Sequence, residues 1–206
     1  MYKLYSIPGT CSTGIVALLK KLGQPAEIIN RDDVPDYATR INATNQVPIL
    51  EDDGFLIREG AAIALYLLEK HDSPWLKGDR AGKTEFQQWL MFNYATLHPA
   101  YGRIFTVAKT MTEGDAKAKL LQQLADKVSD TWQILNERLE GRNFVVGDEA
   151  TIIDYLVVIY SSWNHAFPQL KIALGKNVEH LVKNVSTLPE VQAAYEAENI
   201  RLKVAA

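Results

Sequence analysis

Cysteine is almost absent from this sequence: among 206 residues, only Cys11 carries a thiol. A single cysteine excludes an internal disulfide, a Cys-x-x-Cys redox pair and any zinc site built from several cysteines. We expect no metal site. If Cys11 takes part in covalent chemistry, its partner must therefore come from outside the chain.

Long apolar runs are absent as well. The longest unbroken apolar stretches, residues 61–68 and 155–160, are much shorter than the roughly 18 residues that a membrane span needs. Pro8 and Gly9 soon follow Met1, so no continuous apolar segment of the secretory-signal type is present there. We therefore expect a cytoplasmic protein with no membrane partner.

The sequence also lacks an excess of positive charge. It has 22 Lys and Arg residues against 25 Asp and Glu residues, which gives a formal net charge of -3. Proteins that bind nucleic acids usually need a face rich in Lys and Arg, because neutralised phosphates supply most of the non-specific affinity. We expect no nucleic-acid partner. The hydrophobic content of 47% is sufficient for ordinary protein cores.

The first 75 residues change their apolar period repeatedly, which indicates a mixture of strands and helices. In chain order, the predicted elements are a strand at 2–7, a helix around 15–22, a strand at 26–30, a hairpin of strands at 47–51 and 55–58, and a helix through 63–67. The hairpin is predicted because Asp and Gly at 52–54 supply turn residues between two apolar runs. No element is predicted over residues 31–46, which are polar and show no clear period.

After a linker rich in Gly, Asp and Lys at 76–82, the strand signals mostly vanish. Apolar residues recur at helical spacing over 121–139 and again over 156–163. We therefore expect an α/β domain over residues 1–75 and an all-helical domain over residues 83–206. The segment from Thr151 to Asp154 predicts a capping box at the start of a helix, which is a structural role.

Cys11 is a candidate for chemistry because of its place in the predicted structure. It follows Pro8, Gly9 and Thr10 where a strand ends and a helix begins, so its thiol is expected near a helix N-terminus. The helix dipole there favours the thiolate and lowers the thiol pKa. A buried, inert thiol is the alternative. The hydroxyl of Ser12 either donates to a thiolate or only caps the helix.

Two further segments have the features of a binding site for a peptide-like ligand. Pro48 cannot donate a ladder hydrogen bond, and a cis bond before it would let Val47 present its N–H and C=O to an extended peptide. Glu59 precedes a predicted helix, where a carboxylate can hold an ammonium group and the helix N–H groups can hold a carboxylate. A Glu that only favours the helix start is the alternative.

His98 and Pro99 interrupt an otherwise helical run. Pro99 is expected to clash with the carbonyl of Ala95 and to bend the helix, at a cost of about 3 kcal/mol, which would open a groove. His98 could reach a ligand there, although a solvated or core-packed histidine is commoner. Trp163 lies on an apolar stripe, where core packing is the default interpretation.

Taken together, these segments resemble the glutathione S-transferase family, closest to its bacterial beta class. The resemblance is carried, in this order and spacing, by residues 8–12, 45–48, 59–63 with 66–67, the His98 region, and 151–154 with Trp163. It implies a thioredoxin-like βαβαββα domain followed by an all-helical domain, and a cis bond before Pro48. It also implies a homodimer with the active site near the interface.

The resemblance further implies individual roles, with glutathione as a co-substrate and no other cofactor. Cys11 matches the active-site cysteine that contacts or covalently binds the glutathione sulfur, and Ser12 is the second candidate catalytic residue. The backbone of Val47 matches the partner of the cysteinyl part. The residues expected to bind glutathione are Tyr5, Thr10, Cys11, Gln46, Val47, Pro48, Glu59 and Gly60, and those expected on the electrophile side of the cleft are His98, Tyr101 and Trp163.

The sequence departs from the beta class at two points. The class often has a lysine between the second strand and the Val-Pro segment, whereas here that stretch offers only Arg31 and Arg40. An asparagine that the class can place two residues after the tryptophan equivalent to Trp89 is Met91 in this chain. The partner of the glycyl carboxylate of glutathione is therefore undetermined by the sequence.

The resemblance predicts a detoxification transferase that conjugates glutathione to small hydrophobic electrophiles. One alternative is a glutathione-dependent thiol–disulfide oxidoreductase or peroxidase that uses Cys11. A second alternative is a non-catalytic interaction module, since the same fold serves different functions. Such a module needs neither Cys11 nor Glu59, so their presence favours a working glutathione site.

Overall fold

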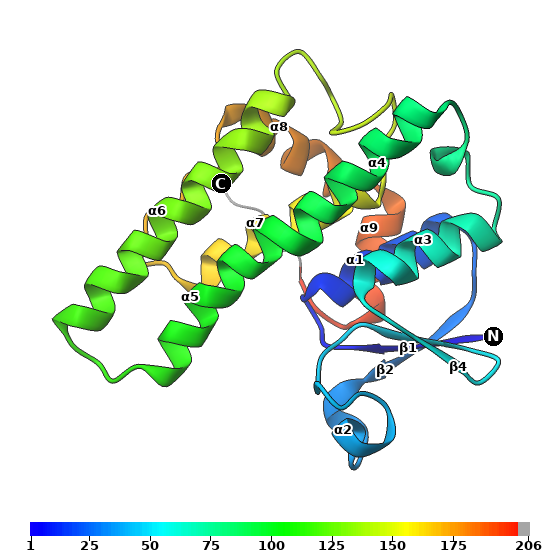
Figure 1. The fold of residues 1–206 in the computed structure, drawn as a ribbon, viewed down its shortest axis with the longest axis horizontal. Helices are drawn as coiled ribbons and strands as arrows, with labels where there is room; N and C mark the ends of the chain where they lie inside the picture. The colour runs from blue at the N-terminus through cyan, green and yellow to red at the C-terminus, as the bar shows by residue number, and fades with distance from the viewer. Residues whose placement is uncertain (202–206) are drawn as a thin grey trace.

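The computed structural model describes residues 1–201 and begins with a four-stranded sheet covered by helices on both faces (Figure 1). The sheet has the order β2-β1-β3-β4, in which β1 and β2 are parallel and the other two pairs are antiparallel. The elements of this half are β1 (Tyr2–Ser6), α1 (Cys11–Lys21), β2 (Ala26–Asn30), α2 (Tyr37–Arg40), β3 (Ile49–Asp52), β4 (Phe55–Arg58) and α3 (Gly60–Lys70). The predicted βαβαββα order is confirmed.

Alternation along β1 explains how the sheet acquires two covered faces. Leu4 belongs to the main core, which includes buried residues of α1 and α3, whereas the adjacent Tyr5 packs with Tyr37 of α2 and with Ile49 on the opposite face. The short helix α2 and the 3-10 turn at Arg31–Asp33 lie in the stretch for which the sequence predicted no element.

From residue 80 to residue 201, every regular element is helical, which confirms the predicted all-helical second half. Between the halves, α3 ends at Lys70, a 3-10 turn covers Pro74–Leu76 and the next helix begins at Arg80. The helices are α4 (Arg80–Phe92), α5 (His98–Thr110), α6 (Asp115–Arg138), α7 (Ile152–Ser162), α8 (Lys176–Val185) and α9 (Pro189–Ala197). None of the helices within residues 1–201 is both long and apolar enough to cross a membrane.

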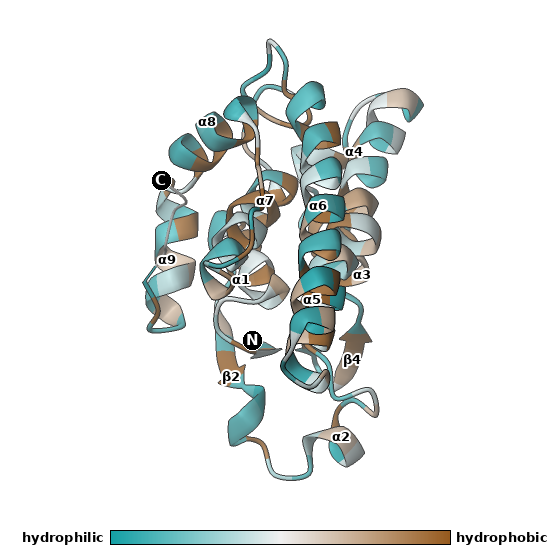
Figure 2. Ribbon diagram, turned by 90° about the vertical axis from the view of Figure 1, so that its left-hand side faces the viewer, coloured by the Kyte–Doolittle hydropathy of each residue, from teal (hydrophilic) through white to brown (hydrophobic). Residues whose placement is uncertain are grey.

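Helix α7 forms the centre of the helical half. It is mostly apolar along its length, whereas α6 and α8 each show hydrophilic residues on one face (Figure 2). Its N-terminus has the predicted capping box: Asp154 accepts hydrogen bonds from the backbone N–H of Thr151 at 2.8 Å and of Val145 at 2.9 Å. Burial of Asp154 raises its pKa to about 6. Helices α7 and α9 both pack on α1, so the two halves share one core.

The helical path between α4 and α5 contains a π-helical turn that the sequence did not predict. The chain continues from α4 into α5 through one π-helical turn at Asn93–Leu97, in which the N–H of His98 donates to the carbonyl of Asn93. This wide turn lies directly before Pro99, whose ring would clash with the carbonyl of Ala95 in a regular α-helix. Within this turn, Asn93 donates to the carbonyl of Ile153 in α7 at 3.4 Å, and Tyr94 lies against Gly60 at the start of α3.

Candidate functional site

A cavity of about 710 Å³ opens between the carboxyl end of β1, the start of α3 and the junction of α4 with α5. The lining residues that the sequence predicted are Thr10, Cys11, Gln46, Val47, Pro48, Glu59, Gly60 and His98. The structure therefore gathers eight predicted site residues from four separate segments around one space. The lining also includes residues to which the sequence assigned no ligand contact, among them Ile7, Asn42, Leu65 and Tyr94.

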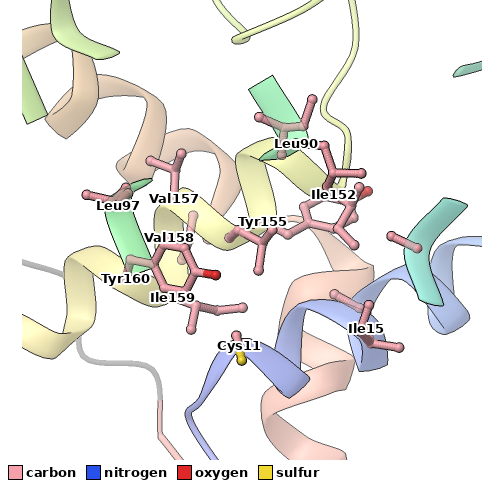
Figure 3. Close-up of a cluster of buried hydrophobic side chains, with 14 of the residues drawn as sticks. Cys11, Ile15, Leu90, Leu97, Ile152, Tyr155, Val157, Val158, Ile159 and Tyr160 are labelled. Atoms are coloured by element: carbon pink, nitrogen blue, oxygen red, sulfur yellow. The ribbon is translucent and has the colours of Figure 1, made fainter. Parts of the chain in front are cut away.

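Cys11 is the first residue of α1 and only 5% of it is exposed. Its thiol donates to the carbonyl of Val47, with a sulfur–oxygen distance of 3.7 Å. Figure 3 shows Cys11 at the edge of the apolar cluster that includes Ile159 and Tyr160 of α7. Burial in these surroundings raises the pKa of Cys11 to about 12, although backbone N–H groups act in the opposite direction.

The expected net lowering of the Cys11 thiol pKa is therefore wrong for the protein without ligand. The dipole and the N–H groups of the first turn favour the thiolate, but removal of the sulfur from water disfavours it more strongly. A neutral Cys11 is a hydrogen-bond donor at neutral pH. That property suits it to stabilise an anionic sulfur beside it.

Ser12 is fully buried and lies outside the cavity lining. Its hydroxyl lies 2.7 Å from the hydroxyls of both Ser6 and Thr10, and it accepts from the N–H of Ile7 at 3.2 Å. These partners occupy the hydroxyl within the loop that precedes α1. The structure thus places Ser12 where it holds the Cys11 loop, and its predicted catalytic role stays a prediction.

The same loop is held by a residue from the far end of the chain. Glu198, just after α9, accepts from Ser6 Oγ at 2.5 Å, from Thr13 Oγ1 at 2.6 Å and from the N–H of Gly9 at 3.1 Å. Burial raises the pKa of Glu198, although the three donors act in the opposite direction. No sequence pattern pointed to this residue, which lies 192 positions from Ser6.

The Val47-Pro48 peptide bond is cis, which confirms the expected isomer. Side chains from the α2 region hold the backbone just before this bond. The carbonyl of Gln46 accepts from Tyr37 Oη and from Asn42 Nδ2, both at 3.0 Å. Arg31 donates to the carbonyl of Asn45 at 2.8 Å and lines the cavity. Arg40, the other basic candidate, lies on the exposed part of α2 and is not among the lining residues.

Glu59 connects β4 to α3 and has a positive φ of 67°, which a residue with a side chain rarely adopts. Such a conformation costs about 1–3 kcal/mol and occurs often at functional sites. Glu59 makes no side-chain cap bond to α3. Its exposed carboxylate and the first N–H groups of α3 are therefore available on the cavity side.

An apolar cavity of about 360 Å³ adjoins the first one, with which it shares Thr10 and His98. Trp163 and Phe105 form its walls. The rings of His98 and Trp163 contact each other edge to face, with centroids 5.3 Å apart. Burial lowers the pKa of His98, which favours the neutral imidazole. Trp163 Nε1 also donates to the carbonyl of Gly9 at 2.8 Å.

Besides Ser12, two further predicted residues lie away from both cavities. Tyr101 is fully buried, and its hydroxyl accepts from Trp132 Nε1 at 2.8 Å and donates to Asn164 Oδ1 at 2.6 Å. Tyr5 lies on the α2 face of the sheet, where its hydroxyl donates to Glu51 at 3.1 Å. Both hydroxyls are thus occupied by protein partners, and neither residue lines a cavity.

Comparisons with known proteins agree with the observed fold. The family model for the glutathione S-transferase N-terminal domain matches residues 1–69. Glutathione S-transferase D7 of Drosophila melanogaster is 31% identical over 222 residues, which cover 95% of this chain and 96% of the relative.

Solved structures show the same fold over nearly the whole chain. A glutathione S-transferase from Xylella fastidiosa has a TM-score of 0.86 at 20% identity, with 98% of this chain and 100% of the neighbour covered. A bacterial beta class enzyme from Sphingomonas chungbukensis has a TM-score of 0.82 at 23% identity, with 97% and 100% covered. Because the chain is 31% identical to a glutathione S-transferase over 96% of that relative, it belongs to the glutathione S-transferase family.

Proposed function

We propose that this protein conjugates glutathione to small hydrophobic electrophiles. The observation that carries the proposal is the single cavity that joins the Cys11 thiol, the backbone of Val47 and the N-terminus of α3, next to an apolar cavity. A γ-linked tripeptide has an amino-acid end, a central thiol and a terminal carboxylate. We assign each of these three groups of the ligand to a partner that lines the cavity.

At one end, the γ-glutamyl group of glutathione is bound at the start of α3. The exposed carboxylate of Glu59 is a partner for its ammonium group, and the first N–H groups of α3 are partners for its carboxylate. The helix dipole adds to this attraction.

In the middle, the cysteinyl part pairs with the backbone of Val47. Without ligand, the carbonyl of Val47 accepts from the thiol of Cys11. When the ligand's cysteinyl N–H takes over that carbonyl, the Cys11 thiol is released to donate to the glutathione sulfur. A neutral donor beside this sulfur stabilises its thiolate, which is the nucleophile.

At the other end, Arg31 is the partner that we propose for the glycyl carboxylate, because it is the basic residue that lines the cavity. Its side chain is held in place by the carbonyl of Asn45 and by Asp32. A guanidinium can donate to a carboxylate with two N–H groups at once.

The electrophile occupies the adjoining apolar cavity between Trp163, Phe105 and His98. There the thiolate of glutathione attacks an electrophilic carbon, a carbon–sulfur bond forms, and a leaving group such as chloride departs with the bonding electrons. The proton of the glutathione thiol leaves to solvent. Holding both reactants in adjoining cavities removes much of the entropy cost of a bimolecular step.

We extend the proposal to the organisation that the family resemblance implies, which is a cytoplasmic homodimer. In each subunit, residues 1–75 form the glutathione-binding domain and residues 83–206 form the helical domain on the electrophile side. Residues 76–82 form the linker between these two domains. Sedimentation equilibrium of the purified protein tests the dimer. A mass equal to 23.1 kDa at all concentrations would contradict it.

The decisive functional test uses the Cys11→Ala variant with an aryl chloride and, separately, with a low-molecular-weight disulfide. Conjugation should persist at reduced rate, because the thiolate loses one donor but keeps its position. Loss of disulfide reduction with retained conjugation agrees with the proposal. If the unmodified protein reduces disulfides with glutathione but conjugates none of a panel of electrophiles, it is a thiol–disulfide oxidoreductase instead. If the folded protein fails to bind immobilised glutathione, it is an interaction module.

A further inference from the structure

Tyr94 has an unusual position at the start of α3. It belongs to the π-helical turn between α4 and α5, and the end of its ring lies against Gly60. A Cβ atom at position 60 would lie 2.6 Å from the hydroxyl oxygen of Tyr94 and closer still to ring carbons. The phenol end of Tyr94 therefore occupies the space that any side chain at position 60 would need.

The hydroxyl of Tyr94 has no hydrogen-bond partner within residues 1–201, and solvent does not reach it. A buried polar group without a partner lowers the stability of a protein, and a phenylalanine would avoid this cost. Yet Tyr94 lines the same cavity as Glu59 and Gly60. An unused donor thus lies beside the free N–H groups of the first turn of α3.

We propose that Tyr94 is a glutathione-binding residue whose hydroxyl joins the N–H groups of α3 in binding the carboxylate of the γ-glutamyl end. This inference rests on the proposed function, which places that end of glutathione at α3. The hydroxyl is closed to water in the protein without ligand, so the Tyr94 ring must turn toward the cavity for its hydroxyl to meet the ligand carboxylate. Burial and the nearby Cys11 raise the pKa of Tyr94, so the hydroxyl keeps the proton that it donates.

Tyr160 provides a matched control within the same molecule. Its hydroxyl is also buried and also has no partner within the described residues, but Tyr160 lies on α7 and lines neither cavity. Tyr94→Phe and Tyr160→Phe each remove one such oxygen and no packing atom of the ring. Both variants should be at least as stable as the unmodified protein in urea unfolding.

The two variants should differ in their affinity for glutathione, measured by titration calorimetry. Tyr94→Phe should raise the Kd about tenfold, whereas Tyr160→Phe should leave it unchanged. Equal Kd values for Tyr94→Phe and the unmodified protein would overturn the role of Tyr94 and leave the proposed function standing. If the unmodified protein itself gives no binding, the proposed function fails and this inference fails with it.

The pKa of the glutathione thiol in the complex, followed by thiolate absorbance, shows which end of the ligand the hydroxyl meets. It should be the same in Tyr94→Phe as in the unmodified protein, since the hydroxyl binds the carboxylate. A higher thiol pKa in the variant would overturn this assignment and place the donor at the sulfur.

Moving the hydroxyl provides an independent test. Tyr94→Ala removes the ring and makes room for a side chain at position 60, so Gly60→Ser then supplies a hydroxyl in nearly the same place. The Tyr94→Ala/Gly60→Ser protein should bind glutathione about tenfold more tightly than Tyr94→Ala/Gly60→Ala. Equal affinities of these two folded proteins would argue against a donor at this position.

Discussion

Alkylation of Cys11 by iodoacetamide should be far slower in the folded protein than in the unfolded chain. The thiolate is the reactive form of cysteine, and burial raises the pKa of Cys11 from an ordinary value of 9.0 to about 12. A shift of about three pKa units lowers the thiolate fraction at neutral pH about a thousandfold. The restricted access to a thiol that is only 5% exposed acts in the same direction.

The chain is well suited to this measurement because it has one cysteine, so the mass of the intact protein reports a single reaction site. Rates are compared over a pH series for the folded protein and for the chain unfolded in guanidinium. The unfolded rate should reach half its maximum near pH 9 and level off above it, whereas the folded rate should keep rising through that range. A folded rate that is already constant at neutral pH would refute the reasoning, because it would reveal a stable thiolate in the protein without ligand.

Three further predictions concern other positions. Glu198→Ala leaves three donors around the Cys11 loop without their acceptor and should lower the free energy of unfolding by about 2–3 kcal/mol. The KM for glutathione should rise as well. An unchanged urea midpoint would count against this role. Asp154→Ala removes the capping box and should cost a similar amount of stability, yet the glutathione Kd of the folded variant should change less than twofold in calorimetry. Arg31→Gln should raise the Kd for glutathione about tenfold but leave the Kd for its glycyl ethyl ester nearly unchanged, and an equal loss for both ligands would remove Arg31 from the glycyl site.

The sequence contained enough local information to predict most of the first half of the fold. The turn at 52–54 and the alternation on either side predicted the hairpin that β3 and β4 form. Thr151 and Asp154 predicted the start of α7 to within a residue, because a capping box is a local pattern. The stretch 31–46 gave no prediction, since its structure depends on contacts such as those of Tyr37 and Asn42 with the carbonyl of Gln46.

The properties of the site that depend on distant contacts could not be predicted. The position of Cys11 at a helix start was visible in the sequence, but its raised pKa results from burial in the core that α1 shares with α7. Glu198 meets Ser6 and Gly9 only because α9 packs on α1. Tyr94 reaches Gly60 through a π-helical turn, for which Pro99 was the only local sign and was interpreted as a bend.

The crystal structure of the protein with glutathione tests the central claim most directly. We expect the γ-glutamyl end at the first turn of α3, the cysteinyl backbone on Val47 and the glutathione sulfur beside Cys11. Glutathione bound elsewhere on the protein, or bound here with its sulfur turned away from Cys11, would contradict it.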